Sequence, residues 1–321
     1  MMWLALLVAV LLWWLMTGLA LMSVHQSRRI QRIIFTLATG FVLWALIGVE
    51  SNATLHTPLA TITGFAIGLG IWGWLELSYL MGFITGPVKI SATATLSQWQ
   101  RFRYALGTTI YHELLVVGVV GLVCVLGAGL PNPTIQNTLA VLWLMRWSTK
   151  LNLFLGVRHF NSEWLPAHMT YITSYLRPGK NSWFIFVSTL LAAYCTYILF
   201  FFGQVANEPA TALSCFLIAW LAALAVLEHI FLMIPMGETV LWRWARADTV
   251  VSSDAGSRSH SVAACDETAK SGTCVDSAPA ARDHAPLTWL SSVTSTTRSG
   301  LAVSAAVVCF GFIKRLDINH G

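Results

Sequence analysis

Long apolar segments with almost no charge constrain this sequence more than any other feature. A helix needs about 20 mainly apolar residues to cross a bilayer. Seven segments approach or exceed that length, at residues 2–24, 33–50, 59–83, 106–130, 137–157, 183–205 and 211–234. Only 10% of the 321 residues are charged, whereas a soluble domain carries about 25%. The sequence therefore predicts an all-α integral membrane protein, a bundle of about seven transmembrane helices in contact with lipid. It excludes a water-soluble enzyme and a nucleic-acid-binding domain.

The basic residues that flank these segments give the orientation. They fall in loops on one side of the predicted bundle: Arg28, Arg29, Arg32, Lys89, Arg101, Arg103, Arg158, Arg177, Lys180, Arg243 and Arg246. Segments 51–58, 131–136 and 206–210, on the other side, contain no Lys or Arg. Cytoplasmic loops carry the excess of Lys and Arg in membrane proteins. We therefore predict an N-terminus outside and a C-terminus inside, which requires an odd number of spans.

Residues 247–321 differ in composition from the rest of the chain. They are rich in Ser, Ala, Thr and Asp and show no apolar period, as in chains that cannot bury enough apolar surface to fold. We therefore divide the chain into a polytopic transmembrane helical domain, residues 1–246, and a low-complexity, disordered cytoplasmic tail, residues 247–321. The core role is expected not to need the tail. The six cysteines include no Cys-x-x-Cys pair and show no zinc-ligand spacing.

Ionisable residues inside the predicted spans form a second pattern. Such residues are costly in a membrane and are by default candidates for function. At 1.5 Å of helix rise per residue, those on four spans lie at a common depth, about 9–10 Å from the cytoplasmic ends. We interpret this polar layer as a structural ion-pair network, because its three carboxylates can neutralise its two fixed cations. Its members are Glu76, His112, Glu113, Arg146, Lys150, Glu228 and His229.

The same layer admits two binding hypotheses. A carboxylate-bridged di-iron site would use its Glu and His side chains, although the typical Glu-x-x-His spacing is missing. Alternatively, His112 or His229 could be the axial ligand of a tetrapyrrole, since a single imidazole in an apolar bundle can ligate haem iron or chlorophyll magnesium. The sequence contains no Walker loop, Gly-x-Ser-x-Gly or His-Glu-x-x-His motif, so no catalytic residue is assigned.

Two segments between spans have features of their own. Residues 85–105 interleave aromatic and basic residues, which indicates an interfacial helix that leads into the fourth span. In the loop that follows the fifth span, we predict a helix that begins near Glu163, with an apolar face that contains Met169. That face lies on the bundle or the lipid, or docks a client helix. The polar residues assigned to this loop are Asn152, Arg158, Asn161, Glu163 and His168.

The loop also carries a family resemblance. From Lys150 the chain reads KLNLFLGVRHFNSEWLPAHM and continues to Ser174-Tyr175-Leu176. Shorter motifs agree with it: Trp74-Leu75-Glu76, Gly86-Pro87, Leu227-Glu228-His229, Pro235 and Leu241-Trp242-Arg243-Trp244. Over residues 1–246, this sequence resembles the photosynthetic-complex assembly protein family PuhE of purple phototrophic bacteria.

The resemblance implies a role in building the reaction centre and its core light-harvesting complex. It also implies a bacterial cytoplasmic or intracytoplasmic membrane, with the N-terminus periplasmic, and reaction-centre or light-harvesting polypeptides as partners. Bacteriochlorophyll becomes a plausible ligand, either directly or through those subunits. Catalytic activity is not implied. Two functions therefore remain open: a non-enzymatic assembly factor, and an integral-membrane enzyme or metal- or tetrapyrrole-binding protein that uses the Glu/His layer.

Overall fold

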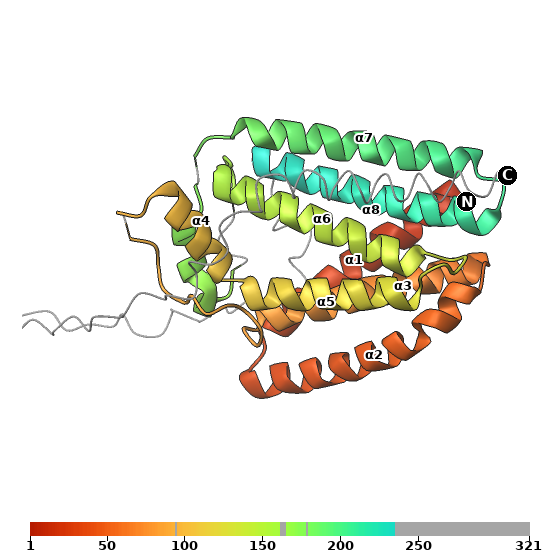
Figure 1. Cartoon of the computed structure of the whole chain (residues 1–321), viewed down its shortest axis with the longest axis horizontal. Coiled ribbons are helices and arrows are strands. Elements are labelled where there is room, and N and C mark those ends of the chain that lie inside the picture. Colours follow the sequence, from red (N-terminus) through yellow and green to blue (C-terminus); the bar gives the residue numbers. More distant parts are fainter. Residues whose placement is uncertain (94, 161–164, 178, 235–321) are drawn as a thin grey trace, which may run out of the picture. The chain divides into compact units, whose positions relative to one another are not determined.

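The computed structural model describes residues 1–93, 95–160, 165–177 and 179–234. These residues form α-helices and one long 3-10 helix, with no β-strand among them, so the all-α prediction is confirmed (Figure 1). The predicted tail, the segment Leu241–Arg246, Asn161 and Glu163 all lie outside the described residues. The helices are α1 (Met2–Val24), α2 (Arg28–Thr54), α3 (Pro58–Leu80), α4 (Gln98–Gly107), α5 (Ile110–Leu126), α6 (Thr134–Leu155), η2 (Ala167–Tyr175), α7 (Trp183–Val205) and α8 (Pro209–Met233).

Each of the seven predicted apolar segments contains a long helix. Five helices (α1, α2, α3, α7 and α8) are long and apolar enough to cross a membrane, and α4 with α5 makes a sixth candidate that is bent by 61°. The chain is therefore a multi-pass membrane protein. Helix α6 has 22 residues, but Arg146 and Lys150 lower its hydropathy, so it falls short of a span by composition and the seventh span stays a prediction.

The starts of two helices follow directly from the sequence. Thr57 precedes α3, and its side chain accepts a hydrogen bond from the backbone N–H of Ala60. Ser97 and Gln100 form a reciprocal capping box at the start of α4, which satisfies two backbone N–H groups that a helix start leaves free. The interfacial helix predicted within residues 85–105 is thus a separate short helix, and the bend to α5 follows it.

Helix α3 packs against α1, α2, α5, α6 and α8, and two glycines permit its closest approaches. A Cβ atom added to Gly68 would lie 2.9 Å from Cβ of Thr138 on α6. One added to Gly64 would lie 2.8 Å from Oδ1 of Asn52 on α2. Small residues let helix backbones approach closely in membranes, so Gly68 allows the close contact of α3 with α6 and Gly64 that with α2.

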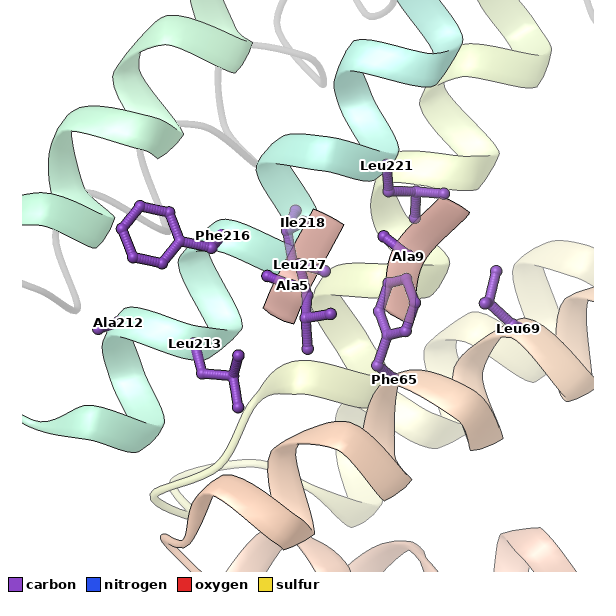
Figure 2. Close-up of a cluster of buried hydrophobic side chains, with 10 residues drawn as sticks. All are labelled: Ala5, Ala9, Phe65, Leu69, Ala212, Leu213, Phe216, Leu217, Ile218 and Leu221. Carbon is purple, nitrogen blue, oxygen red and sulfur yellow. The ribbon is translucent and has the colours of Figure 1, made fainter. Parts of the chain in front are cut away.

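An apolar core joins α1, α3 and α8. Figure 2 shows Phe65 of α3 beside Ala9 of α1, with the larger side chains of α8 around them. Ala5 and Ala9 are completely buried, because α8 packs against this face of α1. The buried members are Ala5, Ala9, Phe65, Leu69, Ala212, Leu213, Phe216, Leu217, Ile218 and Leu221. This core fixes α3, which carries part of the site described below.

The segment after α6 differs from the prediction. The expected helix near Glu163 is a 3-10 helix, η2, that begins at Ala167. Met169 is completely buried, which favours the hypothesis that the face around this residue lies on the bundle. Arg101 of α4 holds the end of η2, since its guanidinium donates to the carbonyls of Ser174, Tyr175 and Leu176 at 3.2, 3.0 and 2.5 Å.

Candidate functional site

Four charged side chains from α3, α5 and α6 form two ion pairs, which we call the ion-pair cluster. Nη1 of Arg146 contacts Oε1 of Glu76, and Nζ of Lys150 contacts Oε1 of Glu113. Nε of Arg146 lies 3.9 Å from the same oxygen of Glu113, which links the two pairs. The Glu113 side chain is only 5% exposed and that of Arg146 12%. Two carboxylates and two cations thus neutralise one another, with the Glu76 and Lys150 side chains 21% and 26% exposed.

The spacing along α6 brings the two cations together. Arg146 and Lys150 are four residues apart and therefore lie on one face of the helix. Between them stands Tyr79 of α3, whose ring centroid lies 5.1 Å from Cζ of Arg146 and 5.4 Å from Nζ of Lys150. A cation over an aromatic face is attracted to it, more strongly where water is excluded. Sequence reasoning missed Tyr79, although its position one turn after Glu76 was the available signal.

His112 borders the cluster from α5. Its Nε2 lies 2.9 Å from the carbonyl oxygen of Leu75, and a carbonyl can only accept, so Nε2 carries the proton. Nδ1 lies 3.8 Å from Oε1 of Glu113, and the imidazole ring centroid lies 5.0 Å from that of Tyr79. The residue is completely buried. His112 therefore joins α5 to α3 next to the ion pairs.

A second polar group lies on another face of α6. Ser148 Oγ is 2.7 Å from Nε2 of His229 on α8, and Asn152 Nδ2 donates to Ser188 Oγ on α7 at 2.9 Å. Asn152 was predicted as a loop residue, but it lies inside α6 and is completely buried. Ser148 and Ser188 were not predicted. The four-residue spacing of Ser148 and Asn152 was a signal that could have shown Ser148, whereas no comparable signal pointed to Ser188.

The predicted seven-residue layer therefore divides into two groups around α6. Glu76, His112, Glu113, Arg146 and Lys150 come together at α3 and α5, whereas His229 faces Ser148. Glu228, expected as a third carboxylate for the cations, is exposed on α8. The ion pairs of Arg146 and Lys150 are formed with the other two carboxylates, because adjacent residues on a helix point in different directions.

The two buried imidazoles do not fit axial ligation of a tetrapyrrole. Nδ1 of His229 lies 2.8 Å from the carbonyl of Ala225 and must donate to it, and Nε2 is hydrogen-bonded to the Ser148 hydroxyl at 2.7 Å. In His112, Nε2 is committed to Leu75, and Nδ1 faces a carboxylate in a fully buried contact. Among the described residues, no group of three or more His, Cys, Asp or Glu side chains could hold a metal ion.

The loop residues lie apart from both polar groups. Arg158 is exposed, and its backbone N–H donates to Oδ1 of Asn181 at 2.8 Å. His168 lies on η2 with its ring against Gly82. Partial burial lowers the pKa of His168, and the positive charges of Arg28 and Lys89 lower it further. The backbone of Arg158 and the ring of His168 thus contribute to how the loops at this end of the bundle pack.

Comparison with known proteins adds family information. Residues 1–251 match the model of a family described as "Protein of unknown function (DUF3623)". A curated protein of Rhodobacter capsulatus, the "Uncharacterized 30.4 kDa protein in puhA 5'region", is 28% identical over 246 residues. This match covers 75% of the present chain and 90% of that protein. No solved structure matches the chain.

Proposed function

The chain belongs to the DUF3623 family, and from that premise we propose that it is a membrane-embedded, non-enzymatic assembly factor for the photosynthetic reaction centre and its core light-harvesting complex. One observation carries the proposal. The relative from Rhodobacter capsulatus is named for its place in the puhA 5' region, which belongs to a photosynthesis gene cluster. That gene position agrees with the loop resemblance to PuhE.

The ion-pair cluster supports a scaffold role. Both of its cations are paired with carboxylates on neighbouring helices, and the contacts of Ser148 and Asn152 extend the polar links to α8 and α7. Breaking one partner of a buried ion pair typically costs 3–5 kcal/mol. Such links hold α6 in one orientation against four helices. A protein that presents a fixed surface to client helices needs a rigid bundle of this kind.

The exposed apolar faces support membrane polypeptides as clients. Leu37 and Ile47 on α2 are 70% and 83% exposed, and Leu190 on α7 is 73% exposed. These side chains face lipid or the helices of a client subunit. We propose a cytoplasmic or intracytoplasmic membrane, with the N-terminus periplasmic and the C-terminus cytoplasmic. Bacteriochlorophyll is then a partner through the subunits that bind it.

The proposal is tested in a purple phototrophic bacterium that lacks its own family member. Expression of this chain should restore the amount of reaction centre and core antenna, measured by near-infrared absorption of membranes. A tagged copy should co-purify reaction-centre or light-harvesting polypeptides, identified by mass spectrometry together with any pigment. Equal core-complex levels with and without the chain would overturn the proposal.

A second candidate, a membrane enzyme that uses the layer, is favoured by one observation. Among the described residues, Nδ1 of His112 and Oε2 of Glu113 are buried without a hydrogen-bond partner, and such unsatisfied buried atoms can mark a catalytic role. A membrane enzyme would lose function in His112→Gln or Glu113→Gln at unchanged protein abundance. A scaffold would lose abundance and function together, so quantifying both in the same membranes separates the two.

A further inference from the structure

An open groove lies at the end of the bundle that carries α4 and η2. It has a volume of about 670 Å³ and is lined by Arg101, Leu155, Gly156, Leu176, Arg177, Gly179 and Lys180. Three of these seven residues are cations, and none is Asp or Glu. Arg177 lies close enough to Arg101 for their positive charges to repel each other. A concentration of one sign of charge in a concave site attracts a ligand of the opposite sign.

The backbone around the groove is fixed by loop–loop hydrogen bonds. The N–H of Val157 donates to the carbonyl of Arg177 at 3.3 Å, and the N–H of Gly179 donates back to the carbonyl of Val157 at 3.1 Å. The N–H of Ser182 donates to the carbonyl of Gly156 at 3.0 Å. The segments that carry Arg177 and Lys180 are thus held against the end of α6 before any ligand arrives. Preorganisation of this kind lowers the cost of binding.

Gly156 makes this close contact possible. Its φ of +130° lies in a region that side chains with a Cβ rarely adopt. A Cβ at this position would also lie 3.0 Å from the carbonyl oxygen of Lys180. The end of α6 can therefore meet the following loop only with glycine here, and this contact helps to shape the groove.

The surroundings of the groove indicate where its ligand comes from. Trp183, the first residue of α7, is 74% exposed, and Trp99 of α4 is 56% exposed. Trp is enriched at the level of lipid headgroups, where one part of the ring is apolar and the other wet. Leu155, which lines the groove, is 44% exposed. A ligand that joins an anionic group to an apolar chain fits this site. Its anion can bind the cations, and its chain can lie against Leu155 and the Trp side chains.

We propose that this groove binds the phosphate group of an anionic membrane lipid, with Arg177 and Lys180 as its principal ligands. Arg101 completes the positive wall while it also holds the end of η2 through the carbonyls described above. The assignment is independent of the photosynthetic role proposed for the chain. A soluble phosphate would meet the same cations, so the test separates the two sources.

The test uses the full chain, purified in a neutral detergent and stripped of lipid. It is titrated with short-chain phosphatidylglycerol, short-chain phosphatidylcholine and inorganic phosphate, and bound molecules are counted by native mass spectrometry. We expect one phosphatidylglycerol to bind with the highest affinity, and inorganic phosphate not to displace it. Each lost cation near a lipid headgroup should weaken binding about fivefold. Lys180→Gln and Arg177→Gln should therefore each show that loss, and the double variant about 25-fold.

Two single-residue controls keep the test sharp. Lys180→Arg keeps the charge and should bind as the parent does. Arg158→Gln removes an exposed cation of the same loop that does not line the groove, and it should leave this binding event unchanged. Equal affinity for phosphatidylcholine and phosphatidylglycerol, or parental affinity in the double variant, would overturn the proposal. Displacement of the lipid by inorganic phosphate at equal concentration would overturn the lipid as its source.

Discussion

Ser148 Oγ on α6 lies 2.7 Å from Nε2 of His229 on α8, so one hydroxyl joins residues 81 positions apart in the chain. The other ring nitrogen of His229 donates to the carbonyl of Ala225, so both nitrogens of the imidazole have a hydrogen-bond partner. A neutral, hydrogen-bonded histidine can be buried at little cost, whereas an unsatisfied one cannot. The pair therefore acts as a link between helices.

Removal of that hydroxyl should destabilise the bundle. Ser148→Ala leaves a buried ring nitrogen of His229 without its hydrogen-bond partner, and such a loss costs about 1–3 kcal/mol. We expect a lower thermal unfolding temperature in detergent, measured by intrinsic fluorescence. Ser51→Ala, which removes an exposed hydroxyl on α2, is the control. An equal effect of the two changes would contradict the link.

Glu113→Gln should be more damaging than removal of an exposed carboxylate. The change leaves Lys150 without its carboxylate partner and removes the nearby anion from Arg146, and breaking a buried pair typically costs 3–5 kcal/mol. Protein abundance in membranes and the unfolding temperature should both fall. Glu50→Gln, at an exposed position of α2, should change neither by much. Parental stability of Glu113→Gln would show that the cluster does not hold the helices.

The contact of α3 with α6 can be tested with a pair of glycines. Gly68→Ala places a methyl group 2.9 Å from Cβ of Thr138 and should cost about 1–3 kcal/mol. Gly73 has nothing within 4 Å of an added Cβ, so Gly73→Ala should be neutral or stabilise by up to about 1 kcal/mol. Comparison of the two unfolding temperatures gives the answer. A lower unfolding temperature for Gly73→Ala than for Gly68→Ala would contradict the close packing of α3 against α6.

The predicted orientation leads to a labelling experiment. Lys180→Cys and Glu208→Cys replace two exposed residues. Lys180 lies just before the start of α7, and Glu208 lies between the end of α7 and the start of α8. In intact cells, a membrane-impermeant maleimide should label the cysteine at 208 and spare that at 180, and both should react after permeabilisation. The parental chain measures the background from its own cysteines. Preferential labelling of position 180 would reverse the orientation.

Acid should weaken the packing of η2. Burial, Arg28 and Lys89 lower the pKa of His168 relative to about 6.5 in the unfolded chain. The unfolded state then binds protons more readily, so the stability due to neutral His168 is complete above about pH 6.5 and falls as the pH drops through the folded-state pKa. His168→Gln should flatten the fall in unfolding temperature between about pH 7.5 and pH 5.5. Identical pH profiles for the variant and the parent would contradict this.

The sequence predicted the helices well because each span is a long local pattern. Apolar length alone indicates where these helices lie, without any tertiary information. Helix rise also predicted that Glu76, Glu113, Arg146 and Lys150 share one level, and the two ion pairs bring these four side chains together. The sequence alone therefore placed α6 and its two cations at the level of their carboxylates.

The sequence did not predict which carboxylate would pair with which cation. Depth says nothing about which way a helix is rotated, so Glu228 was as good a candidate for Arg146 as Glu76. Rotation is decided by close approaches such as Gly68 against Thr138, which depend on the helix opposite. The same limit applies to Tyr79 and Ser148, whose roles appear only when α3, α6 and α8 are assembled.

The chain order of the ion-pair cluster has a consequence for how the protein is made. Glu76 and Glu113 leave the ribosome before Arg146 and Lys150, and a carboxylic acid can enter the membrane as its neutral form. Arginine cannot shed its proton in a protein, and at the centre of a membrane helix it costs about 2.5–3.5 kcal/mol on insertion scales. In the predicted seven-span topology, α6 is therefore poorly suited to enter lipid alone. We therefore expect α6 to insert after α3 and α5 and in contact with both. The order of synthesis then sets the order in which the helices assemble.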